Sequence, residues 1–210
     1  MCRTPVVIAC VLLLSLDAVS AQRKPAPRKP AAPALVTQPA KVKCPEPLGI
    51  GARTSASYCF VLAGRDPAQG AIVTIPKHAG AATLIFNLHN RHTYSEEDIR
   101  GGRAFAQYRA QIGVLTMAGK LLDRGAVQSE FRTVRDLFER IGGGAGPGGV
   151  KAVAPIGNET VMVSIPAGVT EVSLLGELLD ARTSIGRETE TPGRPVAVVS
   201  NVQVEYRPVK

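Results

Sequence analysis

Short runs of β-branched and other apolar residues, separated by glycine and proline, recur along most of the chain and constrain its fold more than any other feature. The run at 71–75 ends at a proline, and within 82–90 the apolar residues Leu84, Phe86 and Leu88 alternate with period two. Such alternation is typical of a strand with one buried face. The same criteria predict further strands at 58–62, 104–117, 121–133, 150–154, 159–165, 169–175 and 195–206.

Helical signals are few. A helix is predicted at 133–142, where Thr133 can cap its start, apolar residues recur at helical spacing and Gly142 can end it. Ser95 can start a short helical turn before a pair of glycines. Because so little helix cannot build βαβ units, the sequence predicts a mainly β fold: a single antiparallel, jelly-roll-like β-sandwich at 44–210 with one short helix.

The N-terminus has the order of regions found in a secretory signal peptide. Arg3 precedes an apolar run at 5–16, and small residues follow at Ser20 and Ala21. The run is shorter than the roughly 20 residues that span a bilayer, which favours a cleaved signal over the alternative of a short membrane anchor. We therefore expect a signal peptide at 1–21 with cleavage after Ala21, a secreted or periplasmic protein, and no transmembrane segment in the mature chain.

Basic charge is concentrated at 22–43, a segment rich in proline and alanine. This segment contains six Lys and Arg and no acidic residue, whereas 44–210 contains 18 Lys and Arg and 16 Asp and Glu. Repeated proline with little apolar mass favours a disordered linker, which serves either as a spacer or as an adhesive for anionic surfaces. Since the domain itself is nearly neutral, we expect no nucleic-acid partner.

Two cysteines, Cys44 and Cys59, lie beyond the predicted signal peptide. An even pair in an oxidising compartment predicts a disulfide, which would join the start of the domain to its first strand. The alternative is a redox or metal-binding pair, and the CxxC spacing typical of such sites is missing.

The segments 71–88 and 159–175 share one pattern: a strand, an Ile-Pro stop, a glycine turn and a second strand. The pattern indicates either an internal duplication or two uses of one favourable hairpin. Carried by 58–88 and 159–175, it resembles jelly-roll modules of exported bacterial proteins, such as galactose-binding-like sandwiches and pre-peptidase C-terminal domains. The resemblance implies roles in carbohydrate binding, adhesion or assistance to a partner enzyme. Many of those modules use acidic calcium loops or exposed tryptophan, and this chain has no Trp and no Asp-rich loop.

The stretch 89–98 is the richest in groups that bind metals. His89, His92 and Glu96 are candidate ligands for Zn²⁺ or a similar ion, which would be the only cofactor. On an ideal strand the two imidazoles point to opposite faces, so a turn between them would be required. The alternative is a polar strand end leading into an acidic loop, and no HExxH motif is present.

Arginine and tyrosine near this stretch provide a second candidate site. Arg103 and Arg109, with Tyr94 and Tyr108 beside them, are candidate binding residues for an anionic polymer or a sugar. The alternative is that the arginines form surface ion pairs with the acidic residues after Ser95.

Motifs of the common enzymes are missing from the sequence. There is no GxSxG or SxxK, and the glycines at 142–149 follow a predicted helix and precede a strand, the reverse of a dinucleotide site. We therefore expect a non-catalytic exported protein with a binding or assembly role at the cell envelope or outside the cell, with an envelope protein or a glycan as partner. The alternatives are a metal-dependent hydrolase and a carbohydrate-binding module.

Overall fold

The structure, a computed structural model, describes residues 33–132, 136, 139–142, 151–154 and 159–209. The predicted signal peptide, the linker as far as residue 32 and the glycine-rich segment 143–150 lie outside these residues. No helix among the described residues has the length and the apolar character needed to cross a membrane.

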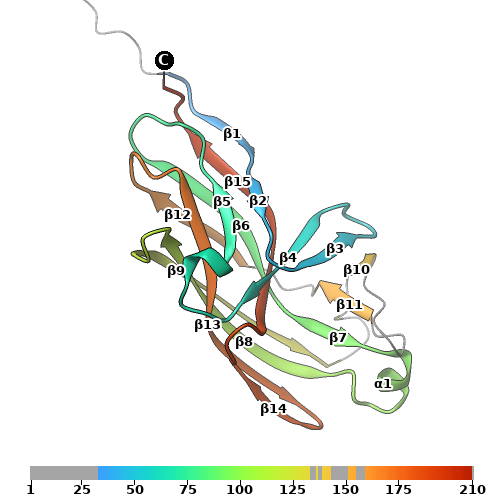
Figure 1. Ribbon diagram of the computed structural model, residues 1–210. Coiled ribbons are helices and arrows are strands. Elements are labelled where there is room, and N and C mark those ends of the chain that lie inside the picture. Colours follow the sequence, from blue (N-terminus) through green and yellow to red (C-terminus); the bar gives the residue numbers. More distant parts are fainter. Residues whose placement is uncertain (1–32, 133–135, 137–138, 143–150, 155–158, 210) are drawn as a thin grey trace, which may run out of the picture. The chain divides into compact units, whose positions relative to one another are not determined.

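Two antiparallel sheets form a β-sandwich, as the strand patterns predicted (Figure 1). They are not closed into a barrel. The first sheet has the order β12-β6-β15-β4-β3-β10-β11-β7, and β1 pairs with β15 beside β4. Its strands are β1 (Val36–Pro39), β3 (Pro47–Gly51), β4 (Ser57–Leu62), β6 (Ala82–Asn90), β7 (His92–Tyr94), β10 (Glu139–Gly142), β11 (Lys151–Ala154), β12 (Glu159–Ile165) and β15 (Pro195–Tyr206).

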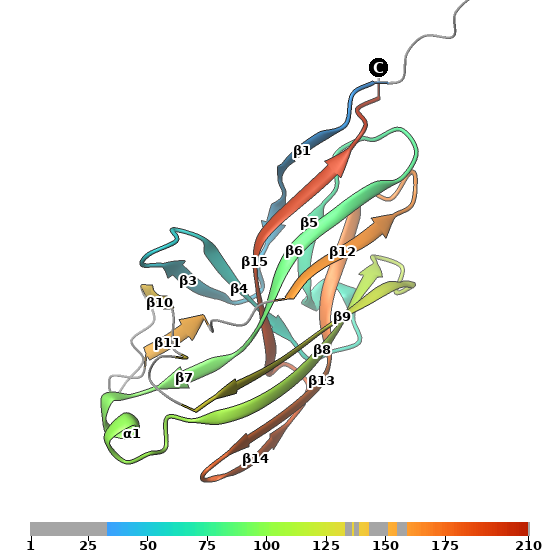
Figure 2. The same cartoon turned by 180° about the vertical axis from the view of Figure 1, so that it is seen from behind.

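The second sheet has the order β2-β5-β13-β8-β9, and β14 extends β13 as a hairpin. Figure 2 shows the same elements from behind. The strands of this sheet are β2 (Lys41–Lys43), β5 (Ala71–Thr74), β8 (Ala106–Thr116), β9 (Leu121–Phe131), β13 (Glu171–Thr183) and β14 (Gly186–Thr189). The helical elements of the described chain are the 3₁₀ turn η1 (Pro67–Gln69) and the short helix α1 (Glu96–Arg100), which begins after Ser95 as predicted.

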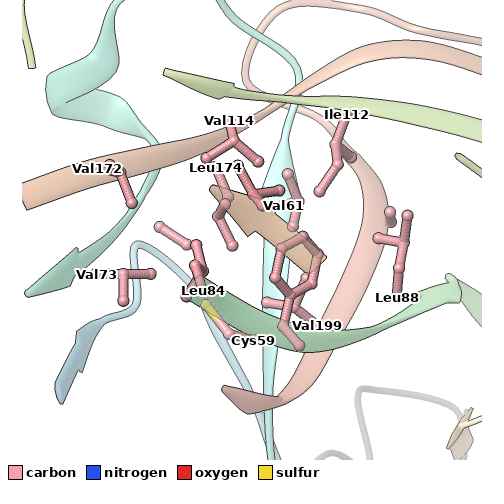
Figure 3. Close-up of a cluster of buried hydrophobic side chains, with 14 of the residues drawn as sticks. Cys59, Val61, Val73, Leu84, Leu88, Ile112, Val114, Val172, Leu174 and Val199 are labelled. Carbon is pink, nitrogen blue, oxygen red and sulfur yellow. The ribbon is translucent and has the colours of Figure 1, made fainter. Parts of the chain in front are cut away.

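The core lies between the inner faces of the two sheets. Leu84, Phe86 and Leu88 of β6 are fully buried, as their alternation predicted. Ile112 and Leu174 from the second sheet meet them across the interface (Figure 3). Burial of each such side chain contributes roughly 1.5–3 kcal/mol to the free energy of folding. The buried layer therefore determines which face of each contributing strand points inward.

The helix predicted at 133–142 is wrong at 139–142, whereas Asp136 has 3₁₀-helical conformation. Residues 139–142 form β10, in which Ile141 pairs with Gly51 and Gly142 with Ile50 of β3. Residues 133–135 and 137–138 lie outside the described part. The local sequence signals favour a helix: Thr133 as a cap, apolar residues at helical spacing and Gly142 at the end. Pairing with a strand far away in sequence overrides that local preference.

The N-terminal strands lie within the segment predicted to be a linker. β1 pairs with the end of β15, with Val36 opposite Tyr206, and β2 pairs with β5, with Lys41 opposite Thr74. Ala40 lies between the two strands, and its N–H donates to the Val202 carbonyl at 2.9 Å. The described domain therefore begins before Cys44, and the chain passes from one sheet to the other at a single residue.

The predicted disulfide is present. Cys44 follows β2 in the chain, and Cys59 lies in β4 with its side chain in the core. The Cα atoms are 5.7 Å apart. The bond therefore joins the N-terminal strand of the second sheet to the first sheet.

Candidate functional site

A cleft of about 330 Å³ lies at the end of the sandwich where α1 and the β13–β14 hairpin project. Both elements are at the same end of the sandwich in Figures 1 and 2. We call this site the hairpin cleft. Charged, aromatic and small side chains line it: Arg91, His92, Asp98, Arg103, Phe105, Ala106, Tyr108, Thr183, Ile185 and Glu188.

The register of three strands forms one wall of the hairpin cleft. Ala181 of β13 pairs with Glu188 of β14 on one side and with Tyr108 of β8 on the other. Residues opposite one another in paired strands project from the same face. The small Ala181 therefore separates two larger polar side chains and leaves room between them.

Arg91 separates β6 from β7 and positions the opposite wall. Its guanidinium Nη1 lies 3.1 Å from Oε1 of Glu188, so the break between the strands is joined to β14. The side chain of Arg91 is 30% exposed and that of Glu188 is 51% exposed. An ion pair this exposed adds little stability, so both side chains remain available to a ligand.

His92 lies at the base of the hairpin cleft. Its Nε2 is 3.1 Å from the Ala104 carbonyl, which can only accept, so Nε2 carries the proton. Nδ1 then accepts from the Tyr108 hydroxyl at 2.8 Å. The ring stacks on Phe131, with centroids 4.3 Å apart and planes 4° apart.

Burial keeps this pair of side chains uncharged. Removal from water lowers the pKa of His92 to about 4, and it raises the pKa of Tyr108 to about 12. At neutral pH the imidazole and the phenol are therefore both neutral. The two side chains are hydrogen-bonded to each other, and His92 is also bonded to the backbone, so both are held at the base of the cleft.

The short helix α1 orients the second charged pair. Ser95 Oγ accepts from the Asp98 N–H at 3.0 Å, and Asp98 Oδ2 accepts from the Ser95 N–H at 3.0 Å, which completes a capping box. The hydrogen bonds from Ser95 lower the pKa of the Asp98 carboxyl, and Arg103 also contributes. Arg103 Nε donates to Asp98 Oδ1 at 3.3 Å, so two charged pairs border the same opening.

The structure places the two predicted histidine ligands, His89 and His92, in different surroundings. His89 is buried, and its Nε2 lies 2.8 Å from the Ser200 hydroxyl, whereas both ring nitrogens of His92 are bonded within the cleft. Glu96 is the first residue of α1. Within the described residues, no group of three or more His, Cys, Asp and Glu could hold a metal ion.

The predicted binding residues separate into three locations. Arg103 and Tyr108 both line the hairpin cleft. Tyr94 is 3% exposed and packs against Ala104, so little of its ring is accessible to a ligand. Tyr94 is the last residue of β7, and its ring points toward a small apolar core beneath α1. Arg109 does not line the cleft; it lines a second hollow of about 170 Å³, which Tyr108 also borders.

Sequence reasoning missed the contribution of the hairpin. The strand predicted at 169–175 continues to Thr183 and returns as β14, which supplies Glu188, while the turn between the two strands supplies Ile185. Ile185 is 83% exposed at the turn. Gly186, which follows Ser184 and Ile185, is a turn signal that marks this hairpin. Arg91 and Glu188 lie 97 residues apart in sequence, so no local pattern predicts their contact.

Comparison with known proteins adds no family to this description. No protein-family model matches the chain, and a search of the curated proteins finds no match.

Proposed function

We propose that this chain is an exported, non-catalytic binding domain and that the hairpin cleft is its ligand site. The convergence of two ion pairs from distant parts of the chain supports the proposal. Arg91 with Glu188 and Arg103 with Asp98 border one opening above a hydrogen-bonded base. Polar groups that converge on a concave surface of a stable scaffold are the usual arrangement of a ligand site.

The charges of the hairpin cleft favour an uncharged ligand. The two arginines and two carboxylates have no net charge together. The carboxylates would repel an anionic ligand, and the guanidinium groups would repel a cationic one. Guanidinium donors and carboxylate acceptors both border the opening, and the partly buried ring of Phe105 adds an apolar surface. This combination suits the hydroxyl groups and apolar faces of a neutral oligosaccharide, the ligand class that we propose.

The proposed location outside the cytoplasm rests on the N-terminal sequence and on the disulfide. The order of regions at 1–21 is that of a secretory signal, and Cys44 and Cys59 are paired. Disulfides persist in secreted and periplasmic proteins and are rare in the cytosol. A fractionation experiment that finds the protein with an intact signal peptide in the cytosol would overturn this part of the proposal.

The ligand is tested with the purified protein on an array of neutral and acidic oligosaccharides, followed by calorimetric titration of the sugars that bind. We expect saturable binding of a neutral sugar. Arg91→Gln should weaken it at least tenfold, because the guanidinium donor at the opening is lost. The matched control is Arg124→Gln, which breaks the Arg124–Glu177 pair away from the cleft and should leave binding unchanged. Equal affinities for both variants, or no binding by the folded protein, would refute the assignment.

A further inference from the structure

The strand β12 is an open edge of the nine-stranded sheet. All seven of its residues pair with β6 without a register shift, from Glu159 opposite Leu88 to Ile165 opposite Ala82. Across the part of the chain that the structure describes, no strand pairs with its other side. Figures 1 and 2 both show β12 at the border of the sheet beside β9. A straight edge strand presents unpaired N–H and C=O groups that can extend the sheet.

Other edges of the described sheets carry features that block such pairing. The edge strand β9 carries Asp123, Arg124 and Glu130, and its pairing with β8 contains an irregularity. The edge strand β2 has only three residues, and two of them are lysines. Charges, bulges and short length are the ways in which natural sheets protect their edges. In β12 the only charged residue is Glu159 at its start, and the strand contains no proline.

The outward face of β12 adds an apolar residue at its centre. Met162 is 65% exposed, whereas Val163 and Ile165 are buried in the core. Val161 faces β9 so closely that a β-carbon added to Gly125 would lie 3.0 Å from its Cγ2. The inner side chains therefore fix the strand in place, and the edge needs no rearrangement to accept a partner.

We propose that β12 pairs antiparallel with β12 of a second copy of this chain, around a two-fold axis at Met162. Met162 is the middle residue of Glu159–Ile165, so the axis places Met162 opposite itself. Thr160 then faces Ser164, and Glu159 faces Ile165. No like charges oppose one another, so the strand is complementary to its own copy. The pairing joins the nine-stranded sheets of the two copies.

The test is the oligomeric state of the purified protein, measured by sedimentation velocity over a range of concentrations. We expect a monomer–dimer equilibrium. Met162→Lys places two positive charges opposite each other and should raise the dissociation constant at least tenfold. The matched control is Met117→Lys, since Met117 is 39% exposed in the turn between β8 and β9 and is not part of the β12 edge. This control should dimerise as the wild type does.

Charge reversal makes the test specific for the two-fold axis. Met162→Glu alone should also be monomeric, and a mixture of Met162→Glu with Met162→Lys should restore a heterodimer. A wild-type protein that remains monomeric up to about 100 µM, or a dimer that Met162→Lys leaves intact, would overturn the proposal. The result is independent of the proposed ligand, because Met162 does not line the hairpin cleft.

Discussion

The hydroxyl of Tyr108 lies 2.8 Å from Nδ1 of His92, and the direction of this hydrogen bond is fixed by a carbonyl on the other side of the ring. Since Nε2 donates to Ala104, Tyr108 must be the donor to Nδ1. One phenol thereby satisfies a buried imidazole that would otherwise have an unpaired acceptor. The contact joins β8 to β7 at the base of the hairpin cleft.

Removing the Tyr108 hydroxyl should destabilise the protein. Tyr108→Phe leaves Nδ1 of His92 buried without a donor, which costs about 1–3 kcal/mol in the free energy of unfolding. The measurement is urea denaturation at pH 7.5. Tyr206→Phe is the matched control, because the Tyr206 hydroxyl donates to Gln38 at 3.2 Å in an exposed position. That variant should lose less than about 0.5 kcal/mol, and equal losses in the two variants would contradict the role given to Tyr108.

Stability should fall as the pH falls from 6.5 toward 4. Burial lowers the pKa of His89 and of His92 from 6.5 to about 4, so in this range the unfolded chain binds protons that the folded chain does not. The free energy of unfolding has its full value above pH 6.5. Each of the two rings lowers it by about 3 kcal/mol once the pH reaches 4. Urea denaturation at pH 7.5 and at pH 4.5 measures the loss.

A histidine variant identifies the groups responsible for this pH dependence. His92→Gln should reduce the difference between pH 7.5 and pH 4.5 by about half, because one of the two rings is removed. Hydrogen bonds from Ser95 lower the pKa of Asp98, and hydrogen bonds from Arg132 lower that of Glu130. Those carboxyls lose their contributions as the pH falls through and below their ordinary pKa values of 3.8 and 4.5, so most of that loss lies below the measured range. An unchanged pH difference in His92→Gln would assign the effect elsewhere.

Gly176→Ala should destabilise the sandwich where β13 approaches the first sheet. A β-carbon at Gly176 would lie 2.6 Å from Val196 Cγ2 and 3.3 Å from the Ala63 Cα, so side chain or backbone must move. Overpacking of this kind costs about 1–3 kcal/mol. In Gly64→Ala the nearest atom would be 3.5 Å away, so that variant should be neutral or slightly stabilised. Thermal unfolding of both variants compares the two sites, and equal melting temperatures would contradict the close approach.

The Cys44–Cys59 bond should contribute roughly 3 kcal/mol, the value expected from chain entropy for a closed loop of this size. The double variant Cys44→Ala/Cys59→Ala should lose that amount in urea denaturation. The wild type measured with a reductant should shift in the same direction, and the double variant should not respond to the reductant. A wild type that is insensitive to the reductant, although its thiols are shown to be free, would contradict the prediction.

The sequence predicts strands best where burial follows a simple period. Residues 82–90 and 159–165 match β6 and β12 at both ends, because one face of each strand enters the core. Short strands such as β1 and β14 were missed, since all four residues in each are exposed and no alternation marks them. The segment 139–142 was assigned to a helix because its local signals are helical, while its strand depends on pairing with β3.

The candidate site was only partly predictable for a related reason. His92, Arg103 and Tyr108 are close in sequence, and their residue types mark them as candidates. Glu188 reaches Arg91 only through the register of β14, β13 and β8, which no local pattern encodes. The orientations of Tyr94 and Arg109 follow from the alternation of side chains along their strands. This alternation turns Tyr94 inward and Arg109 outward.

The single-residue crossing at Ala40 has a mechanical consequence. A force applied to the chain before residue 33 would reach β1 first, and β1 is antiparallel to β15 with Val36 beside Tyr206. Extraction along the strand axis loads several hydrogen bonds at once. Behind them β2 engages the second sheet, and the Cys44–Cys59 bond returns the chain to β4 of the first sheet. A tether attached at this end would therefore pull on both layers together, and the domain would resist being peeled open one strand at a time.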